Sequence, residues 1–129
     1  MNENQAFFSF LDNEKFISLT TYYKSGRGVA TPVEFVIRDS KLLVNTRKDS
    51  YKVKRIRNEN KAEIAPCTMR GKEKDPKKSV YVRILPEGED EDAKIAFEEK
   101  YSGFFYKLVS KLTFWRQQEE RVYLEIVPR

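Results

Sequence analysis

The sequence predicts a mainly β protein, a small closed or nearly closed antiparallel barrel of six strands with only one or two substantial helices. Six short segments rich in β-branched and aromatic residues, separated by polar or glycine-containing turns, indicate the strands. Apolar residues at helical spacing are found in only a few segments of the chain. With 129 residues, the chain is expected to form a single domain over residues 1–129 and to bury roughly two thirds of the surface of its unfolded state.

The expected elements follow in a simple order. A short amphipathic helix over residues 2–13 comes first, because its apolar residues recur at helical spacing. A second short helix is expected over residues 50–58, and a longer one from about residue 89 to residue 112. The first three strands are expected to form an antiparallel meander. The strands are expected over residues 15–23, 29–39, 41–47, 61–69, 78–86 and 121–128.

The segment NTRKDSYKVKRIRN, residues 45–58, is strongly basic, with six Lys or Arg residues and one Asp. Thr46 ends a strand and Ser50 stands at the start of the expected helix. A helix N-terminus has unsatisfied N–H groups and a partial positive charge, which favour an anion. The segment could therefore form a phosphate cradle, although it lacks the glycines of a P-loop. The side chains available for it are Thr46, Arg47, Lys48, Ser50, Lys52 and Lys54.

Two other interpretations of this basic segment remain open from the residues alone. In the plainer one, Ser50 only caps the helix and the basic residues form its solvated face. In the other, the segment binds nucleic acid, but Tyr51 is the only aromatic residue within it that could stack on a base. A nucleic-acid partner is therefore not expected.

Composition excludes several classes of function. The chain has no His and one cysteine, Cys67, so it lacks an intrachain disulfide, the usual zinc and haem ligands, and any His-based acid/base mechanism. We expect no metal, and a buried structural role for Cys67. The net charge of +5 indicates anionic partners only weakly, because 20 acidic residues are mixed among 25 basic ones. Without a membrane-spanning run or a signal peptide, a cytoplasmic protein is expected.

Pro32 is an unusual residue for the middle of an alternating strand. Proline has no N–H group, so in a central strand it would remove a hydrogen bond of the ladder. We therefore expect Pro32 to lie on an edge strand, at a bulge, or where a ligand faces the backbone.

Three motifs in order resemble a known family. The segments LTTYYKSGRGVATPVEFV, LLVNTRKDSYKVKRIRN and AEIAPCTMRGK are similar to the flavin- and deazaflavin-dependent oxidoreductases related to pyridoxamine 5'-phosphate oxidase. Within that family they resemble the branch of coenzyme F420-dependent enzymes. The similarity continues through EEKYSGFFYKLVSKL and RVYLEIVP, so it covers nearly the whole chain. It implies a split β-barrel of the FMN-binding type.

The resemblance also implies a homodimer, with the cofactor in a groove between the two subunits. The cofactor ring would lie against the second and third strands, and its phosphate would lie on the basic turn. Carried over to this sequence, the ring-side residues are Thr31, Pro32 and Val33. The residues around the phosphate or ribityl chain are Thr46, Arg47, Ser50 and Lys52, with Lys54 and Arg55 as further contributors.

The activity implied by the resemblance is that of an oxidoreductase, in which reduced F420 transfers a hydride to a small electron-poor substrate. FMN is the rival cofactor, because its phosphate would fit the same cradle. The alternative is a non-catalytic protein that stores or senses a flavin or tetrapyrrole. No catalytic residue is identifiable, and the candidate proton donors are Tyr22, Tyr23 and Glu34.

Two further features bear on the choice of cofactor. Glu34 stands where a large aromatic or apolar residue is expected in this branch, and a carboxylate near the ring would repel an anionic cofactor. The loop RGKEKDPKK could receive the polyglutamate tail of F420, or be a solvated turn. Its lysines are Lys72, Lys74, Lys77 and Lys78.

Overall fold

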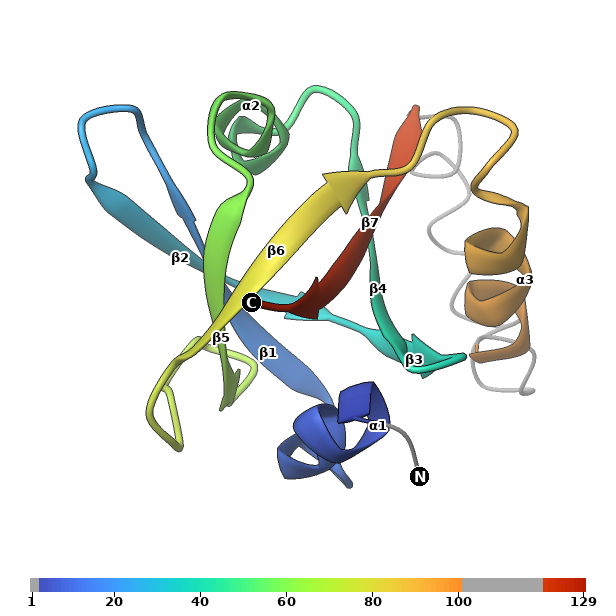
Figure 1. Ribbon diagram of the computed structural model, residues 1–129, viewed down its shortest axis with the longest axis horizontal. Coiled ribbons are helices and arrows are strands. Elements are labelled where there is room, and N and C mark those ends of the chain that lie inside the picture. Colours follow the sequence, from blue (N-terminus) through green and yellow to red (C-terminus); the bar gives the residue numbers. More distant parts are fainter. Residues whose placement is uncertain (1–2, 101–119) are drawn as a thin grey trace.

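The computed structural model describes residues 3–100 and 120–129. In these residues one curled antiparallel sheet and three α-helices are found (Figure 1). The strands are β1 (Phe16–Tyr22), β2 (Gly28–Glu34), β3 (Val36–Arg38), β4 (Lys41–Arg47), β5 (Lys61–Cys67), β6 (Lys78–Ile84) and β7 (Arg121–Pro128). The helices are α1 (Glu3–Phe8), which continues into a 3₁₀ turn (Ser9–Leu11), α2 (Tyr51–Asn58) and α3 (Glu91–Lys100).

The predicted mainly β class is confirmed, and the split barrel is the fold observed. The described residues contain seven strands where six were predicted, because the segment expected as one strand over residues 29–39 is divided at Phe35 into β2 and β3. The predicted helices at the N-terminus and over residues 50–58 are present. The third begins as expected with α3, while its predicted continuation over residues 101–112 lies outside the described residues.

The predicted meander of the first three segments is confirmed in its pairings, because the second segment pairs with the first through β2 and with the third through β3. The hydrogen-bonded order is β2-β1-β5-β6-β7-β4-β3. β2 pairs with β1 from Gly28 to Glu34, whereas β3 pairs with β4. The two edge strands of this order are therefore consecutive in the chain and separated only by Phe35. The sheet has to curl until its edges meet, and β2 accordingly also contacts β4.

The main core fills the inside of the curled sheet. Alternate residues of the strands point inward, as a period of two requires. Apolar side chains of the N-terminal helical segment and of α2 close the two ends, at the bottom and top of Figure 1. The residues of this core are Phe8, Leu11, Ile17, Leu19, Phe35, Leu42, Val44, Ile56, Ala62, Ile64, Val80, Val82, Leu124 and Ile126.

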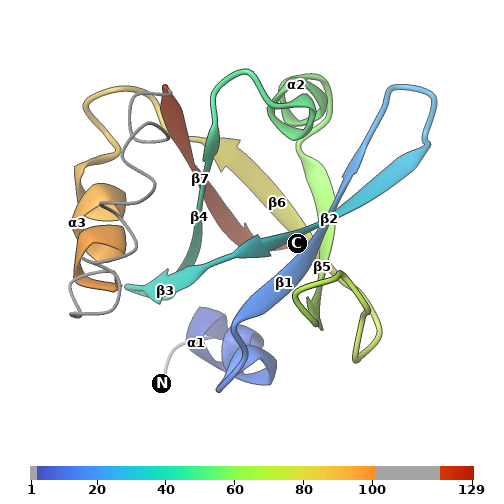
Figure 2. The ribbon, with the colours of Figure 1, turned by 180° about the vertical axis from the view of Figure 1, so that it is seen from behind.

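Helix α3 packs on the outside of the barrel, against β3 and its neighbours. Figure 2 shows it on the side away from the β1–β2 hairpin. Leu43 on β4 and Leu85 after β6 form a second cluster with Ala93, Ala96 and Phe97 of the helix. β4 is thus buried on both faces, which explains why its sequence, KLLVNTR, begins as a continuous apolar run rather than an alternating one. No helix among the described residues has the length and apolar character needed to cross a membrane.

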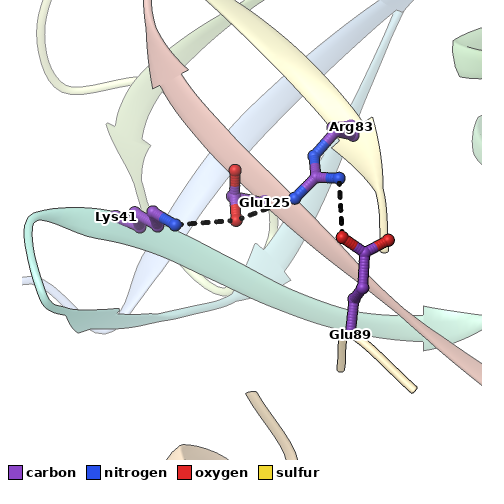
Figure 3. A network of polar contacts seen from close by, with 4 residues as sticks. All are labelled: Lys41, Arg83, Glu89 and Glu125. Carbon is purple, nitrogen blue, oxygen red and sulfur yellow. Dashed lines mark ion pairs between the residues drawn. The ribbon is translucent and has the colours of Figure 1, made fainter. Parts of the chain in front are cut away.

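A row of charged residues crosses three strands on the same outer face (Figure 3). Glu125 of β7 forms ion pairs with Lys41 at 3.3 Å and with Arg83 at 3.5 Å. Arg83 also pairs with Glu89 at 3.7 Å. Only 14% of the Glu125 side chain is exposed, so its carboxylate is the least solvated acid of the row and holds the other members together.

Replacing the central carboxylate should destabilise the barrel. For Glu125→Gln we expect the free energy of unfolding to fall by about 1 kcal/mol, because two ion pairs of a partly buried group are lost. Urea unfolding at low salt measures this change. Glu120→Gln is the control, since Glu120 is exposed and pairs with the exposed Lys48. Equal effects of the two substitutions would show that burial of the row adds nothing.

Candidate functional site

The basic segment is folded as its sequence predicts at the start of α2. The Ser50 hydroxyl oxygen accepts a hydrogen bond from the Val53 N–H at 3.4 Å, so Ser50 is the N-cap. The Ser50 N–H donates to the Arg47 carbonyl at 3.2 Å. The end of β4 and the start of α2 are therefore joined by a tight turn, which brings strand residues close to the helix N-terminus.

Thr46 and Arg47 lie on opposite faces of β4. Thr46 is 4% exposed and, in alternation with Leu42 and Val44, points toward the inside of the barrel. Arg47 is exposed and pairs with Asp49 at 3.3 Å. Thr46 is thus buried beside the turn, and Arg47 places a positive charge on its exposed side.

Lys52 has the most informative environment of the predicted site residues. Burial lowers the pKa of its ammonium group below the usual value, and three guanidinium groups lower it further. They belong to Arg55, Arg121 and Arg47. Within the described part of the chain, no ion pair or hydrogen bond of this ammonium group is found. A half-buried cation among other cations creates a site where an anion would relieve the repulsion.

The predicted ring-side residues lie on β2, at an edge of the hydrogen-bonded order. The expectation that Pro32 occupies an edge strand is therefore confirmed. Thr31 and Val33 are half-buried on the inner face, whereas Pro32 is exposed on the outer face. The Pro32 ring lies beside the backbone of Gly71, where an added Cβ atom would come within 3.7 Å of it. The structure thus places these three residues on one strand but not on one surface.

Glu34 lies close to Lys100 at the end of α3. Burial lowers the pKa of the Lys100 ammonium group, and the Glu34 carboxylate opposes that shift. The same ammonium group donates to the Phe35 carbonyl at 2.9 Å. The negative charge of Glu34 is therefore partly balanced by Lys100, which weakens the expected repulsion of an anionic cofactor.

The lysine-rich loop between β5 and β6 is engaged mostly in internal contacts. Lys74 pairs with Glu14 at 2.9 Å and Lys77 lies 3.9 Å from Glu73. The Lys78 ammonium group lies 4.5 Å from the centre of the Phe10 ring. These contacts favour the interpretation of the loop as a turn over that of a binding site for the polyglutamate tail of F420.

The candidate proton donors also have partners. The Tyr22 hydroxyl group donates to the Glu63 carboxylate, and this hydrogen bond together with burial raises the pKa of Tyr22. The Tyr23 ring lies against the guanidinium groups of Arg27 and Arg55, at 5.3 and 5.4 Å. Cys67 is buried, as expected, and burial raises the pKa of its thiol.

A groove that the sequence analysis missed lies between the β1–β2 turn and α2. Its volume is about 550 Å³. Arg55 contributes to the wall of this groove, and Lys54 lines both the groove and the hollow at the end of β4. The signal in the sequence is the segment YYKSGR, whose pattern predicts the end of a strand followed by a hairpin turn. The lining residues are Tyr23, Lys24, Ser25, Arg27, Tyr51, Lys54, Arg55 and Asn58.

The sequence model of one protein family, described as pyridoxamine 5'-phosphate oxidase, matches residues 4–128. The chain belongs to this family. The resemblance to this family found from the three motifs is therefore confirmed, and the curled sheet is the family's split barrel. A comparison with curated protein sequences finds no match.

Solved structures with the same fold bind different cofactors. The haem storage protein HutZ from Vibrio cholerae is 12% identical, with a TM-score of 0.67 over 100% of this chain and 92% of its own. A candidate pyridoxamine 5'-phosphate oxidase from Listeria innocua is 17% identical, with a TM-score of 0.61 and coverage of 99% and 94%. An FAD-binding protein from Mesorhizobium loti is 17% identical, with a TM-score of 0.60 and coverage of 99% and 89%. At sequence identities this low, the similarity establishes a shared fold and nothing more.

The lowered pKa of Lys52 should make the stability of this protein vary with pH in the alkaline range. Because the pKa of Lys52 is lower in the folded than in the unfolded protein, the unfolded chain binds more protons between the two values. The free energy of unfolding should therefore rise as pH increases through this window, which ends near 10.5. At pH 7, Lys52→Gln should raise it by about 0.5 kcal/mol, the size of a solvent-screened charge interaction.

Urea unfolding at pH 7 and pH 10 in a phosphate-free buffer tests this prediction. Lys48→Gln removes an equal charge from the same turn, where Lys48 pairs with the exposed Glu120 at 3.3 Å. It should not stabilise the protein at pH 7. A loss of stability in Lys52→Gln at pH 7 would contradict the repulsive environment of Lys52.

Proposed function

We propose that this protein is an oxidoreductase that binds a deazaflavin or flavin cofactor through the cofactor's phosphate group and acts on a small organic substrate. The observation that carries the proposal is the environment of Lys52, a half-buried lysine whose ammonium pKa is lowered by burial and by the charges of three arginines. A phosphate group would neutralise this charge and could accept hydrogen bonds from several donors at once.

The α2 N-terminus adds to this phosphate site. Ser50 is held in place by its capping bond, and the free N–H groups of the first helical turn carry a partial positive charge. Arg47, on the exposed side of the same turn, adds a further positive charge to the site. Thr46, buried beneath the turn, supports it from inside the barrel.

In this proposal β2, at the sheet edge, provides one wall for the cofactor ring, with Pro32 on its exposed outer face and Thr31 and Val33 supporting it from the inner face. A second subunit provides the opposite wall, so the proposal includes a homodimer. The cofactor supplies the hydride chemistry when bound. The barrel would hold the ring, exclude water from one of its faces, and leave the other open to the substrate.

F420 is the proposed cofactor and FMN the alternative. F420 is supported by the motifs around Pro32 and the basic segment, while FMN is supported by the phosphate site, which would fit it equally well. The flavin-binding relative in Mesorhizobium loti shares the fold and supports the same class of ligand. The internal contacts of Lys74, Lys77 and Lys78 do not favour either one.

Cofactor titration with matched variants tests the phosphate site. F420 and FMN are each titrated into the wild-type protein, with the absorbance and fluorescence of the cofactor as signals. Lys52→Gln should weaken binding at least about tenfold, since a charge-assisted contact to phosphate is lost. Lys48→Gln should change affinity by less than about threefold, because screening reduces the effect of an exposed charge.

The outcomes separate the parts of the proposal. Tight binding of one cofactor, followed by its oxidation or reduction with enone or quinone substrates, would support an oxidoreductase and identify its coenzyme. Binding of neither cofactor would overturn the proposal. Equal losses in the Lys52 and Lys48 variants would place the phosphate elsewhere.

A non-catalytic tetrapyrrole binder is the second candidate, favoured by the fold shared with the haem storage protein HutZ. The absence of His from the chain argues against it, because haem iron is usually held by His, Met, Cys or Tyr. Among the other ligand types, Cys67 is buried and Tyr22 is bonded to Glu63, whereas Met69 and Tyr51 are exposed. We therefore expect haem titration to give no spectrum of a His-ligated haem. A stable complex with a defined Soret band would favour this second function.

A further inference from the structure

The groove between the β1–β2 turn and α2 has the features of a second anion site. Figures 1 and 2 both show the end of this hairpin and α2 side by side at the same end of the molecule. The turn is held by hydrogen bonds from the Tyr23 N–H to the Arg27 carbonyl and from the Gly26 N–H to the Tyr23 carbonyl, both 2.9 Å. The wall opposite the helix is therefore preformed.

Arg55 is the residue that makes this groove unusual. It is 7% exposed, and its Nε donates to the Thr21 hydroxyl oxygen at 2.6 Å. Its guanidinium group also lies 5.4 Å from the centre of the Tyr23 ring. Among the described residues no carboxylate forms an ion pair with Arg55, and the Thr21 hydroxyl oxygen is the acceptor found for its guanidinium group. Burying a charge without a counter-ion is unfavourable, so the groove has a strong preference for an anion.

The other charged residues of the groove add to this preference. Lys24 and Arg27 come from the hairpin turn and Lys54 from the helix, and no acidic side chain lies among the lining residues. Four positively charged side chains, two from the hairpin turn and two from α2, therefore line the same groove. Their number suits a ligand with several negative charges rather than a single carboxylate.

Tyr51 gives the groove a surface for a planar group. Its side chain is 74% exposed, although it lies at the first position of α2 beside the charged residues. Lys54 lies 5.1 Å from the ring centre, which still leaves most of the ring open to solvent. An exposed aromatic ring next to several cations is the arrangement that binds a base by stacking and its phosphates by charge.

We propose that this groove binds a nucleoside polyphosphate, with the base stacked on Tyr51 and the phosphates against Arg55, Arg27, Lys24 and Lys54. A volume of about 550 Å³ lies within the range of small-molecule sites. The site is separate from the cofactor's phosphate site at Lys52. Arg55 adjoins both, since its charge acts on Lys52. An anion in the groove would therefore reduce the repulsion felt at Lys52, and the two sites are coupled.

Calorimetric titration in magnesium-free buffer tests the groove with ATP, ADP, AMP, tripolyphosphate and triglutamate as probes. Affinity should rise from AMP to ATP, because more phosphate charges face the four cations. Tyr51→Ala should weaken ATP binding about tenfold, since stacking on one base is lost. Arg27→Gln should weaken it by a similar factor. Arg57→Gln is the matched control, because it removes the same charge from α2 but does not line the groove.

Several results would overturn the proposal. These are no binding of ATP, equal losses in the Arg27 and Arg57 variants, tripolyphosphate binding as tightly as ATP, or tighter binding of triglutamate. The same titration with Lys52→Gln keeps this test apart from that of the cofactor. ATP binding that persists in this variant while cofactor binding is lost would support two distinct sites. If Lys52→Gln abolished the binding of both ATP and the cofactor while Arg27→Gln affected neither, there would be a single site at Lys52. That result would overturn the proposed groove site.

Discussion

Phe35 is the point where one extended segment leaves the pairing with β1 and begins the pairing with β4. Its side chain is 8% exposed and belongs to the main core, so the change of partner takes place over a buried aromatic ring. Because β2 and β3 are the two edges of the hydrogen-bonded order, this single connection makes the sheet curl on itself. The positions of the hairpin, α2 and the end of β4 all follow from that closure.

The closure concentrates positive charge at one end of the barrel. α2 closes this end with Val53 and Ile56 buried, and four of its other positions carry Lys or Arg toward two sides. On one side the charges of Arg47 and Arg121 act on Lys52, and on the other side Arg55 lines a groove together with the hairpin turn. Burying cations beside cations lowers the stability of the protein alone. The same arrangement prepares it to bind anions, a trade between stability and function that is common at binding sites.

Local patterns were sufficient for much of this structure. The bounds of β4 and β7 match the predicted segments because their apolar residues and flanking turns are unambiguous. The Ser50 cap was predictable from one hydroxyl residue before a helical pattern. The break at Phe35 was not, because the alternation of residues 29–38 continues through it and nothing local marks the change of partner. The groove was missed for a related reason: its residues come from two segments more than twenty positions apart.

By itself, the sequence determined the class of the protein, most of its elements, the family resemblance and the basic segment as the candidate anion site. These properties depend on residue periodicity, on capping and on motif order, all of which are local or read directly along the chain. Only the tertiary structure decided which cations face one another, that Pro32 and Thr31 lie on opposite faces, and that Glu34 lies beside Lys100. Electrostatic interactions and burial depend on distances across the barrel, and strand pairing alone sets those distances.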